Sequence, residues 1–404
     1  MRILHLSADY PDPVSQRKTR AIANLLALAP DHDHKVYSMN RTSWRGSLSC
    51  QRFQDAVSDA HQVLCYPAPP MGVLHRRYLH QLADWILSDC HRSGFRPDAI
   101  HAHKLTVEGM AAERIAAELS IPLIVSVQGN TDLKIALAKP GLRAAFRQIW
   151  QHADVALPFA PWARDRLDAL LGQRKAPTLC LPCPGPADRI IAPMTAPPVI
   201  RTAFNLDDHR NKNAHRLIRA IGIAAREIPS IVLEIIGAGD PHAHAALLRT
   251  ADRFAKGHIR FRGKVANADM QGLLNTSAAF ALVSHRESFG MVFAEALLAG
   301  TPCLIPEGRA IDGYLPNGGV TLCARPNDTA AIAAALCRLV RQQHAFKSRL
   351  DHYQRSGRLD FLRRPAIRET YAQALTTAFR TKPERVTATT DQQFSNHAGA
   401  FIPA

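Results

Sequence analysis

The chain has 404 residues, enough for two domains of roughly 150–200 residues each, and its 47% hydrophobic and 6% aromatic content is typical of a soluble α/β protein. No run of about 18 uncharged apolar residues is present and the chain turns polar at Ser7, so we expect neither a membrane span nor a signal peptide, and hence a cytoplasmic protein. A formal net charge of +16 predicts anionic partners, but zinc-finger spacing, RNP-like aromatic segments and basic helices followed by heptads are absent, so nucleic acid is not expected.

The first half of the chain alternates short apolar runs with helical patterns. This alternation predicts a parallel sheet covered by helices on both faces. In chain order we expect strand Arg2–Leu6, helix Thr19–Ala29, strand Lys35–Ser38, strand Ala99–His103, helix Glu108–Leu119, strand Pro122–Gln128 and strand Ala153–Leu157.

Residues Leu74–Leu87 combine apolar residues at helical spacing with a basic start, Arg76 and Arg77. The pattern favours an ordinary amphipathic helix packed on the domain surface. A helix lying on an anionic membrane surface is the alternative.

The segment from Pro182 to Pro198 has six prolines in seventeen residues and cannot form a regular element. We therefore place a hinge at residues 184–198, between domains at 1–183 and 199–360. A C-terminal helix at 361–381 is expected to pack back on the first domain, and the polar residues 382–404 are expected to form a disordered tail.

Beyond the hinge the same alternation restarts, which predicts a second doubly wound domain and an active-site cleft between the carboxyl ends of two parallel sheets. The expected elements are helix Asn213–Glu227, strand Ile231–Ile236, helix His242–Ala255, strand Ile259–Phe261, helix Ala268–Leu274, strand Ala279–Val283, helix Val292–Ala299, strand Pro302–Ile305 and helix Asp328–Arg341.

The most informative stretch is AFALVSHRESFGMVFAEALLAGTPCL, from Ala279 to Leu304. A buried strand, a polar loop and the pair Phe289-Gly290 lead into a helix, so the backbone amides of Gly290, Met291 and Val292 are placed to hold a diphosphate. Glu295, further into the helix, is placed to accept hydrogen bonds from a ribose diol. Glu287, on the loop, would lie near the hexose of a donor.

Glu287 and Glu295 are separated by seven residues. In this the sequence resembles the retaining family-4 glycosyltransferases of the GT-B fold, whose E-x7-E motif has the same strand-loop-helix setting. The resemblance implies two Rossmann-like domains facing across a cleft. It also implies that Glu295 binds the ribose hydroxyls and that Glu287 faces the donor sugar.

Other segments resemble the same family over roughly residues 1–380. The turn with Gly237 and Gly239 is similar to the family's glycine turn, and IRFRGKV resembles its strand beside the nucleobase, where the backbone near Lys264 and Val265 would read the base. Pro182–Gly185 occupies the place of its hinge turn.

Two departures concern residues that contact the donor in the family. Asn205 stands where the family has an arginine. Lys212 matches the family's phosphate-binding lysine. Arg210 either supplies the charge that the missing arginine would have carried or is a solvated residue. Gln128 replaces a histidine that meets the donor sugar, and an amide can hydrogen-bond a hydroxyl but does not titrate near neutrality. His103 either points into the cleft near the acceptor or is a buried structural histidine.

Metal and redox chemistry are not predicted. The pairs His32/His34, His101/His103 and His242/His244 lack a third ligand at zinc-like spacing. Cys180 and Cys183 have C-x-x-C spacing without a second pair, so buried thiols are favoured over a zinc or redox site. We expect metal-independent transfer without a cofactor.

Together these features predict a retaining glycosyltransferase that moves a hexose from a UDP- or GDP-sugar to a glycan hydroxyl. The basic charge favours a lipid-linked acceptor for cell-surface polysaccharide, and an enzyme peripheral on the inner membrane face. A soluble acceptor, another GT-B enzyme such as an epimerase, and a non-catalytic nucleotide-binding protein remain alternatives.

Overall fold

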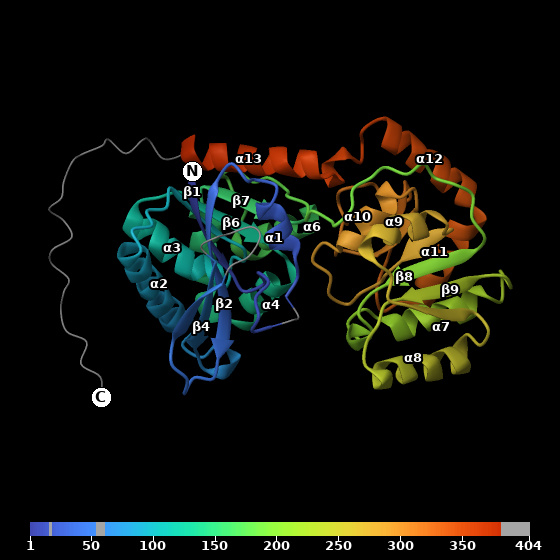
Figure 1. Cartoon of the computed structure of the whole chain (residues 1–404). Coiled ribbons are helices and arrows are strands. Elements are labelled where there is room, and N and C mark those ends of the chain that lie inside the picture. The colour runs from blue at the N-terminus through green and yellow to red at the C-terminus, as the bar shows by residue number, and fades with distance from the viewer. Residues whose placement is uncertain (16–17, 54–60, 381–404) are drawn as a thin grey trace.

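The computed structural model describes residues 1–15, 18–53 and 61–380. The predicted tail at 382–404 lies outside the described residues. Figure 1 shows two α/β domains side by side, with the last helix running across the top of the first. The helices are too short or too polar to cross a membrane, in the part of the chain that the structure describes.

The first domain is built on a seven-stranded sheet with the order β3-β4-β2-β1-β5-β6-β7. Its neighbouring strands pair in parallel, except that the edge strand β3 is antiparallel to β4. The strands are β1 (Arg2–Ser7), β2 (Asp33–Thr42), β3 (Ser49–Phe53), β4 (His61–Pro67), β5 (Ala99–Ala102), β6 (Leu123–Val127) and β7 (Val155–Pro158).

Helices cover both faces of this sheet. The apolar residues of helix α2 are buried in the domain core: Leu79, Leu82, Ala83 and Ile86. This is the amphipathic helix packed on the domain that the sequence favoured for Leu74–Leu87. The helices are α1 (Ala21–Leu26), η1 (Pro70–Gly72), α2 (His75–Arg92), α3 (Glu108–Leu119), α4 (Asn130–Ala138), η2 (Pro140–Leu142), α5 (Arg143–His152) and α6 (Pro161–Leu171).

The second domain has a six-stranded parallel sheet with the order β10-β9-β8-β11-β12-β13. Its strands are β8 (Val199–Ala203), β9 (Val232–Ile236), β10 (Ile259–Gly263), β11 (Ala279–Ala281), β12 (Cys303–Pro306) and β13 (Thr321–Ala324). Its helices are η3 (Leu206–Asp208), α7 (Ala214–Ala224), α8 (Pro241–Phe254), α9 (Asn267–Asn275), α10 (Met291–Leu298), α11 (Thr329–Arg341), α12 (Gln343–Arg355) and η4 (Asp360–Leu362).

Helix α13 (Arg364–Arg380) returns to the first domain, as Figure 1 shows. Its buried residues Ile367, Tyr371 and Leu375 pack with Ile3 and Ile124 of the first sheet. Arg368 adds an ion pair with Asp31, and Arg364 donates to the carbonyl of Gly185. The C-terminal helix therefore ties the end of the chain to the first domain.

Strand order reverses at one point in each sheet. In the first, β2 and β5 lie on opposite sides of β1; in the second, β9 and β11 lie on opposite sides of β8. Loops that leave the carboxyl ends of two such strands diverge and leave room for a ligand. These two switch points are therefore where a site is expected.

The carboxyl edges of the two sheets face each other. Trp162, at the start of α6, donates its indole N–H to the carbonyl of Ala310 at 2.8 Å, and the Tyr314 hydroxyl donates to the carbonyl of Phe159 at 3.0 Å. One partner in each bond follows β7 and the other follows β12. Because both segments leave the carboxyl end of a strand, the two switch points open toward one another.

Candidate active site

Two loops meet at the switch point of the second domain. One follows β8 and the other follows β11, the two strands whose connections diverge. The amide of His285 donates to the carbonyl of Asn211 at 2.8 Å, and the side-chain amide of Asn213 donates to the carbonyl of Val283 at 3.0 Å. These bonds hold residues 211–213 against the loop that carries Glu287.

Lys212 and Glu287 form an ion pair in this place. The Nζ of Lys212 lies 2.7 Å from Oε2 of Glu287, and the Ser284 hydroxyl donates to the same oxygen at 3.3 Å. The side chains are 21% and 13% exposed, so the pair is shielded from bulk water but still reachable. Two residues predicted separately, 75 positions apart, thus share one site.

The N-terminus of α10 lies directly after this pair. Gly290 has φ of +71°, a conformation that L side chains rarely adopt, and a Cβ there would come within 2.7 Å of the Phe293 ring. Phe289 is buried and anchors the turn. The first amides of a helix have no partner within the helix, so those of Met291 and Val292 are oriented for an anion.

Glu295 lies on the buried side of α10, 7% exposed. Burial raises the pKa of its carboxyl to about 7. Its neighbour is the linker: a Cβ on Gly185 would lie 3.6 Å from Oε1 of Glu295. A protonated carboxyl group can both donate and accept hydrogen bonds.

The glycine turn after β9 is packed against the loop after β8. A Cβ on Gly237 would lie 1.9 Å from the carbonyl oxygen of Phe204, and one on Gly239 would lie 2.7 Å from Oδ1 of Asp207. Asn205 accepts a hydrogen bond from the amide of Asp207 at 3.1 Å. Both glycines and Asn205 therefore shape the turn, and the side-chain oxygen of Asn205 is engaged within it.

Arg210, Lys264 and Val265 lie at the same edge of the sheet. Arg210 and Lys264 are exposed and Val265 is half-buried. The carbonyl of Gly263 accepts from the amide of Gly237 at 2.9 Å, which places the Lys264 backbone beside the glycine turn. Neither cation contacts the ion pair of Lys212 and Glu287 directly.

In the first domain Gln128 follows β6 and lies at the carboxyl edge, 9% exposed. Its side-chain amide donates to the carbonyl of His103 at 3.3 Å, and its backbone amide donates to Asp132 at 3.2 Å. Gly129 then turns the chain with φ of +87°, where a Cβ would lie 2.3 Å from the Trp162 ring. Gln128 is therefore held at the edge from two sides.

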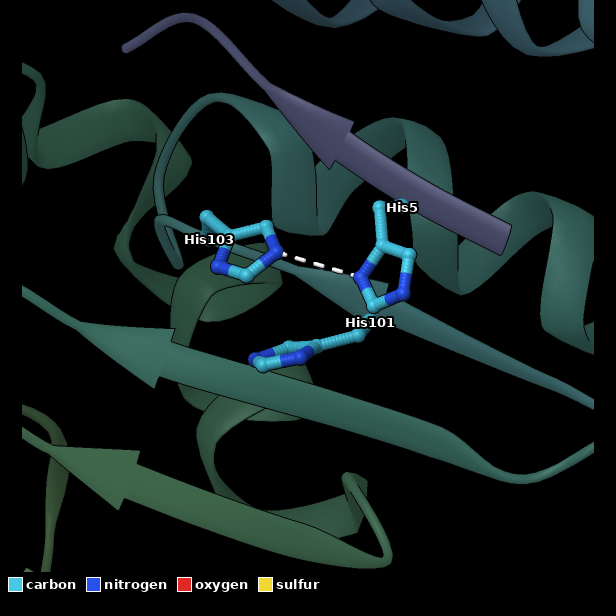
Figure 2. A group of neighbouring side chains, drawn as sticks. All are labelled: His5, His101 and His103. Carbon is cyan, nitrogen blue, oxygen red and sulfur yellow. Dashed lines mark hydrogen bonds between the residues drawn. The ribbon is translucent and has the colours of Figure 1, made fainter. Parts of the chain in front are cut away.

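His103 lies inside the domain rather than at a surface open to an acceptor. Its ring is fully buried, and its Nε2 lies 3.2 Å from Nδ1 of His5 (Figure 2). The His101 ring lies alongside, with ring centroids 4.0 Å apart. The alternative in which His103 is a structural histidine describes this position better.

The histidine contacts define which nitrogens carry protons. Nε2 of His34 lies 2.9 Å from the carbonyl of Ala29, which can only accept, and burial lowers the pKa of His34, His5 and His103. In the neutral rings His34 then accepts from His5 at 2.9 Å, and His5 accepts from His103. Nδ1 of His103 is left as a bare acceptor, buried and without a partner among the described residues.

Three histidine rings lie close enough together to hold a metal ion, a grouping that the spacing of the pairs did not predict. The ring nitrogens of His5, His101 and His103 lie within 4.8 Å of one another. Sequence spacing missed this group because His5 comes from β1, almost a hundred residues before β5. Both nitrogens of His101 already have partners, Ser126 at 2.8 Å and Tyr371 at 3.1 Å, so the arrangement fits a hydrogen-bonded network.

Two buried carboxyl groups of this edge also escaped the sequence analysis. Glu108 accepts from the amide of Ala8 at 2.7 Å, and burial raises its pKa to about 7. Asp132 accepts from the amide and hydroxyl of Thr106, and burial raises its pKa as well. Nothing in the local sequence distinguishes them, because their partners come from distant loops.

The thiols of Cys180 and Cys183 are free. Burial raises the pKa of both, and the nearby carboxylate of Glu287 adds to the effect at Cys183. Cys183 is thus a buried thiol of the kind that the sequence favoured, whereas Cys180 is half-buried.

Comparison with known proteins identifies the family of this chain. Residues 15–184 match the glycosyl transferase 4-like domain, and residues 197–342 match glycosyl transferases group 1. A glycogen synthase of Mycobacterium tuberculosis is 24% identical over 83% of this chain and 85% of its own length. A phosphatidyl-myo-inositol mannosyltransferase of Mycobacterium leprae is 30% identical over 33% of this chain and 35% of its own.

Solved structures share the fold over nearly the whole chain. Sucrose-phosphate synthase from Thermosynechococcus elongatus superposes with a TM-score of 0.69 and 16% identity, over 95% of this chain and 100% of its own. Anabaena HepE in complex with UDP-glucose gives 0.63 and 14%, over 93% and 100%. The chain belongs to the family-4 glycosyltransferases of the GT-B fold and is a glycosyltransferase.

Proposed function

We propose that this glycosyltransferase moves a hexose from a UDP- or GDP-sugar to a glycan hydroxyl with retention of anomeric configuration. The observation that carries the proposal is the ion pair of Lys212 and Glu287 beside the N-terminus of α10. It places a cation, held by a carboxylate, beside oriented backbone amides at a switch point, and the cation and the amides are what a charged leaving diphosphate requires.

The second domain would bind the donor nucleotide. The diphosphate would lie on the amides of Gly290, Met291 and Val292, with Lys212 and the exposed Arg210 as its cations. Glu295 would bind the ribose diol, and the backbone of Lys264 and Val265 would contact the base. Anabaena HepE, which shares the fold, was solved with UDP-glucose, and this supports a nucleotide-sugar donor.

Catalysis would be electrostatic. As the glycosidic bond breaks, negative charge develops on the diphosphate, and Lys212 and the helix amides stabilise it. Glu287 holds the Lys212 ammonium in place and lies where the hexose would approach. We propose that these cations replace a divalent metal in this role, so that transfer requires no added metal.

The first domain would present the acceptor. Gln128 lies at the carboxyl edge of the first sheet, and its amide can hydrogen-bond a sugar hydroxyl. His103 supports Gln128 through its carbonyl and so takes a positioning role, not direct contact. The Trp162 bond to Ala310, whose amide donates to the carbonyl of Glu287 at 3.2 Å, connects this edge to the donor loop.

We propose a lipid-linked glycan as the acceptor, because the chain carries a charge of +16 and one relative is named for a phosphatidylinositol acceptor. A soluble acceptor is the alternative, in line with the relatives named glycogen synthase and sucrose-phosphate synthase.

A transfer assay tests the proposal. Purified protein is incubated with each nucleotide-sugar and a lipid-linked or soluble glycan extract, and proton NMR of the product reports its anomeric configuration. We expect transfer from one donor class with the donor's configuration kept, undiminished by a chelator. An inverted product would refute retention, and conversion of a nucleotide-sugar without acceptor would indicate an epimerase instead.

A further inference from the structure

Four large apolar side chains are exposed on two neighbouring segments of the first domain. Met71 is 88% exposed, Val73 57%, Leu74 55% and Leu137 57%. The first three lie in and after η1, and Leu137 lies near the end of α4. These four residues, here called the apolar tip, stand out because isolated exposed apolar residues are ordinary but a group of them marks an interaction site.

The tip is held in shape by the protein. Nζ of Lys139 donates to the carbonyls of Met71 and Gly72, at 2.9 Å each, and so joins the end of α4 to the turn at η1. Met71 and Leu74 have φ of +56° and +53°, a left-handed conformation that costs free energy for residues other than glycine. The chain thus maintains a conformation that directs apolar side chains into solvent.

The surroundings of the tip are positively charged. Segments 70–83 and 133–153 contain no aspartate or glutamate. Arg76, Arg77 and Lys134 are exposed, and Lys139 is half-buried. The half-buried Glu113 of α3 lies close enough to Arg76 to sense its charge. Asp84, one turn beyond His80 in α2, is exposed and pairs with Arg114, so cations outnumber carboxylates around the tip and favour anions.

A pocket of about 790 Å³ lies beside the tip, between α2 and the end of α4. Its lining combines apolar Leu74 and Leu142 with the polar and charged side chains of His75, Arg76, Arg77, His80 and Lys139. An apolar rim around cationic groups is the pattern expected for an anionic headgroup with attached hydrocarbon.

The tip connects to the acceptor edge through a short series of hydrogen bonds. Nε2 of His75 lies 2.9 Å from the carbonyl of Thr106, and the amide of Thr106 donates to Asp132. Asp132 also accepts from the amide of Gln128. The turn at η1 and helix α4 both follow the carboxyl ends of strands, so the tip and Gln128 belong to one edge of the sheet.

We propose that the apolar tip inserts into an anionic phospholipid leaflet while the surrounding arginines and lysines contact lipid phosphates. Helix α2 itself does not lie in the membrane, because its apolar face is buried in the domain core. The surface involved is instead the turn before that helix and the end of α4. Docking here would hold the acceptor edge at the headgroup level.

Flotation of the full chain with vesicles tests the proposal. We expect binding to phosphatidylcholine vesicles with about 30% phosphatidylglycerol, weak binding to pure phosphatidylcholine, and release at about 500 mM salt. The double variant Arg76→Gln/Arg77→Gln should lower the partition coefficient roughly 30-fold, from about 1 kcal/mol for each cation. Met71→Ser/Leu74→Ser should lower it roughly tenfold.

Matched controls come from the second domain. Arg226→Gln/Arg249→Gln removes the same charge, and Ile223→Ser/Leu248→Ser removes exposed apolar residues. Both should float like the parent chain. No flotation of the parent chain at low salt, or equal losses in control and tip variants, would overturn the proposal.

The link to a lipid-linked acceptor rests on the proposed function, and the two can fail separately. If the tip variants lose flotation and transfer to lipid-linked acceptor but still bind nucleotide, both stand. Flotation without any nucleotide binding would refute the proposed function and leave docking intact. Nucleotide binding and transfer without flotation would refute membrane docking and leave the proposed function intact.

Discussion

The two switch points of this molecule are built differently. At the second, charged groups meet in partly exposed positions: Lys212 pairs with Glu287 beside the amides of α10. At the first, Lys104 pairs with Asp9 at 2.7 Å in a similar way, with side chains 7% and 34% exposed, but this pair stands beside buried polar groups that include Glu108, Asp132 and the histidine network. Both switch points therefore carry an ion pair, but the first adds a network of buried histidines and carboxyl groups, whereas the second adds the amides of a helix N-terminus.

The proposed function accounts for this difference, because the edge of the second domain would bind the donor and the edge of the first domain would bind the acceptor. A leaving diphosphate gains negative charge during the reaction, so the donor edge needs cations that are already in place. An acceptor hydroxyl is neutral and needs mainly orientation. We therefore expect substitutions at the donor edge to change turnover. Substitutions at the acceptor edge should change the stability of the fold or the alignment of the acceptor.

The largest expected effect is on turnover at the donor edge. Glu287→Gln and Lys212→Ala should each lower kcat by about 100- to 1,000-fold, because the first releases the Lys212 ammonium from its ion pair and the second removes a cation that stabilises the leaving diphosphate. Steady-state kinetics with the preferred donor measures this. Glu307→Gln, an exposed glutamate paired with Arg325, serves as control and should keep its rate. Small and equal losses in all three variants would contradict the assigned roles.

The next effect concerns the glycine turn of the donor domain. Gly237→Ala should lower the free energy of unfolding by about 3 kcal/mol, because the residue has φ of +144° and its Cβ would collide with the carbonyl of Phe204. Gly272→Ala is the matched control: it lies in α9 with open space around its Cβ and should stabilise the helix by about 0.5–1 kcal/mol. Urea titrations compare the two, and similar stabilities would show that the turn can relax.

The acceptor edge should reveal its buried histidines through pH. Burial lowers the pKa of His101 to about 3, and lowers those of His5 and His103 as well, so the unfolded chain binds protons that the folded chain does not. Their contribution to stability is present above the unfolded pKa and is lost as pH falls below it. From about pH 7.5 to about pH 6.0, three such histidines should cost about 2 kcal/mol of unfolding free energy.

Replacement of a network histidine tests the origin of that pH dependence. His101→Gln should flatten the slope below about pH 6.5, while His242→Gln, at an exposed position, should leave it unchanged. A slope that is identical in both variants and the parent would mean that other groups titrate.

The smallest expected effect is on the connection between the edges. Trp162→Phe keeps the ring but removes the N–H that donates to the carbonyl of Ala310, which should cost about 1 kcal/mol. We expect a severalfold loss in kcat with nucleotide affinity unchanged. Trp44→Phe, at a residue 53% exposed, is the control. A matching loss of nucleotide affinity in the Trp162 variant would place its effect in the donor site instead.

The contrast between the edges also explains what could be predicted from the sequence. A candidate donor site could be predicted because its glutamates, glycine and helix lie in one stretch, from Glu287 to Glu295, although Lys212 and several other predicted residues come from other segments. The α/β architecture was found because strand and helix periodicities repeat along the chain.

The acceptor edge could not be found in the same way. Its network joins His5, His34, His101 and Tyr371 from four distant segments, and each histidine alone resembles any other buried residue. Strands β3 and β4 were also missed. Ser49–Phe53 has no clear apolar run, and the short run VLCY within His61–Pro67 was not assigned to a strand, so the antiparallel edge was not foreseen. Such features depend on tertiary pairing, which local patterns do not encode.

The most direct test of the central claim is nucleotide binding by the parent chain and by Glu295→Gln. In a thermal-unfolding panel of UDP, GDP, ADP and CMP, one nucleotide at about 100 times its Kd should add roughly 2.7 kcal/mol of stability to the parent chain. The account predicts that Glu295→Gln, which leaves the amides of α10 and Lys212 in place, loses most of this gain at the same ligand concentration. Absence of a shift with every nucleotide, or an undiminished shift in the variant, would contradict a donor site at the N-terminus of α10.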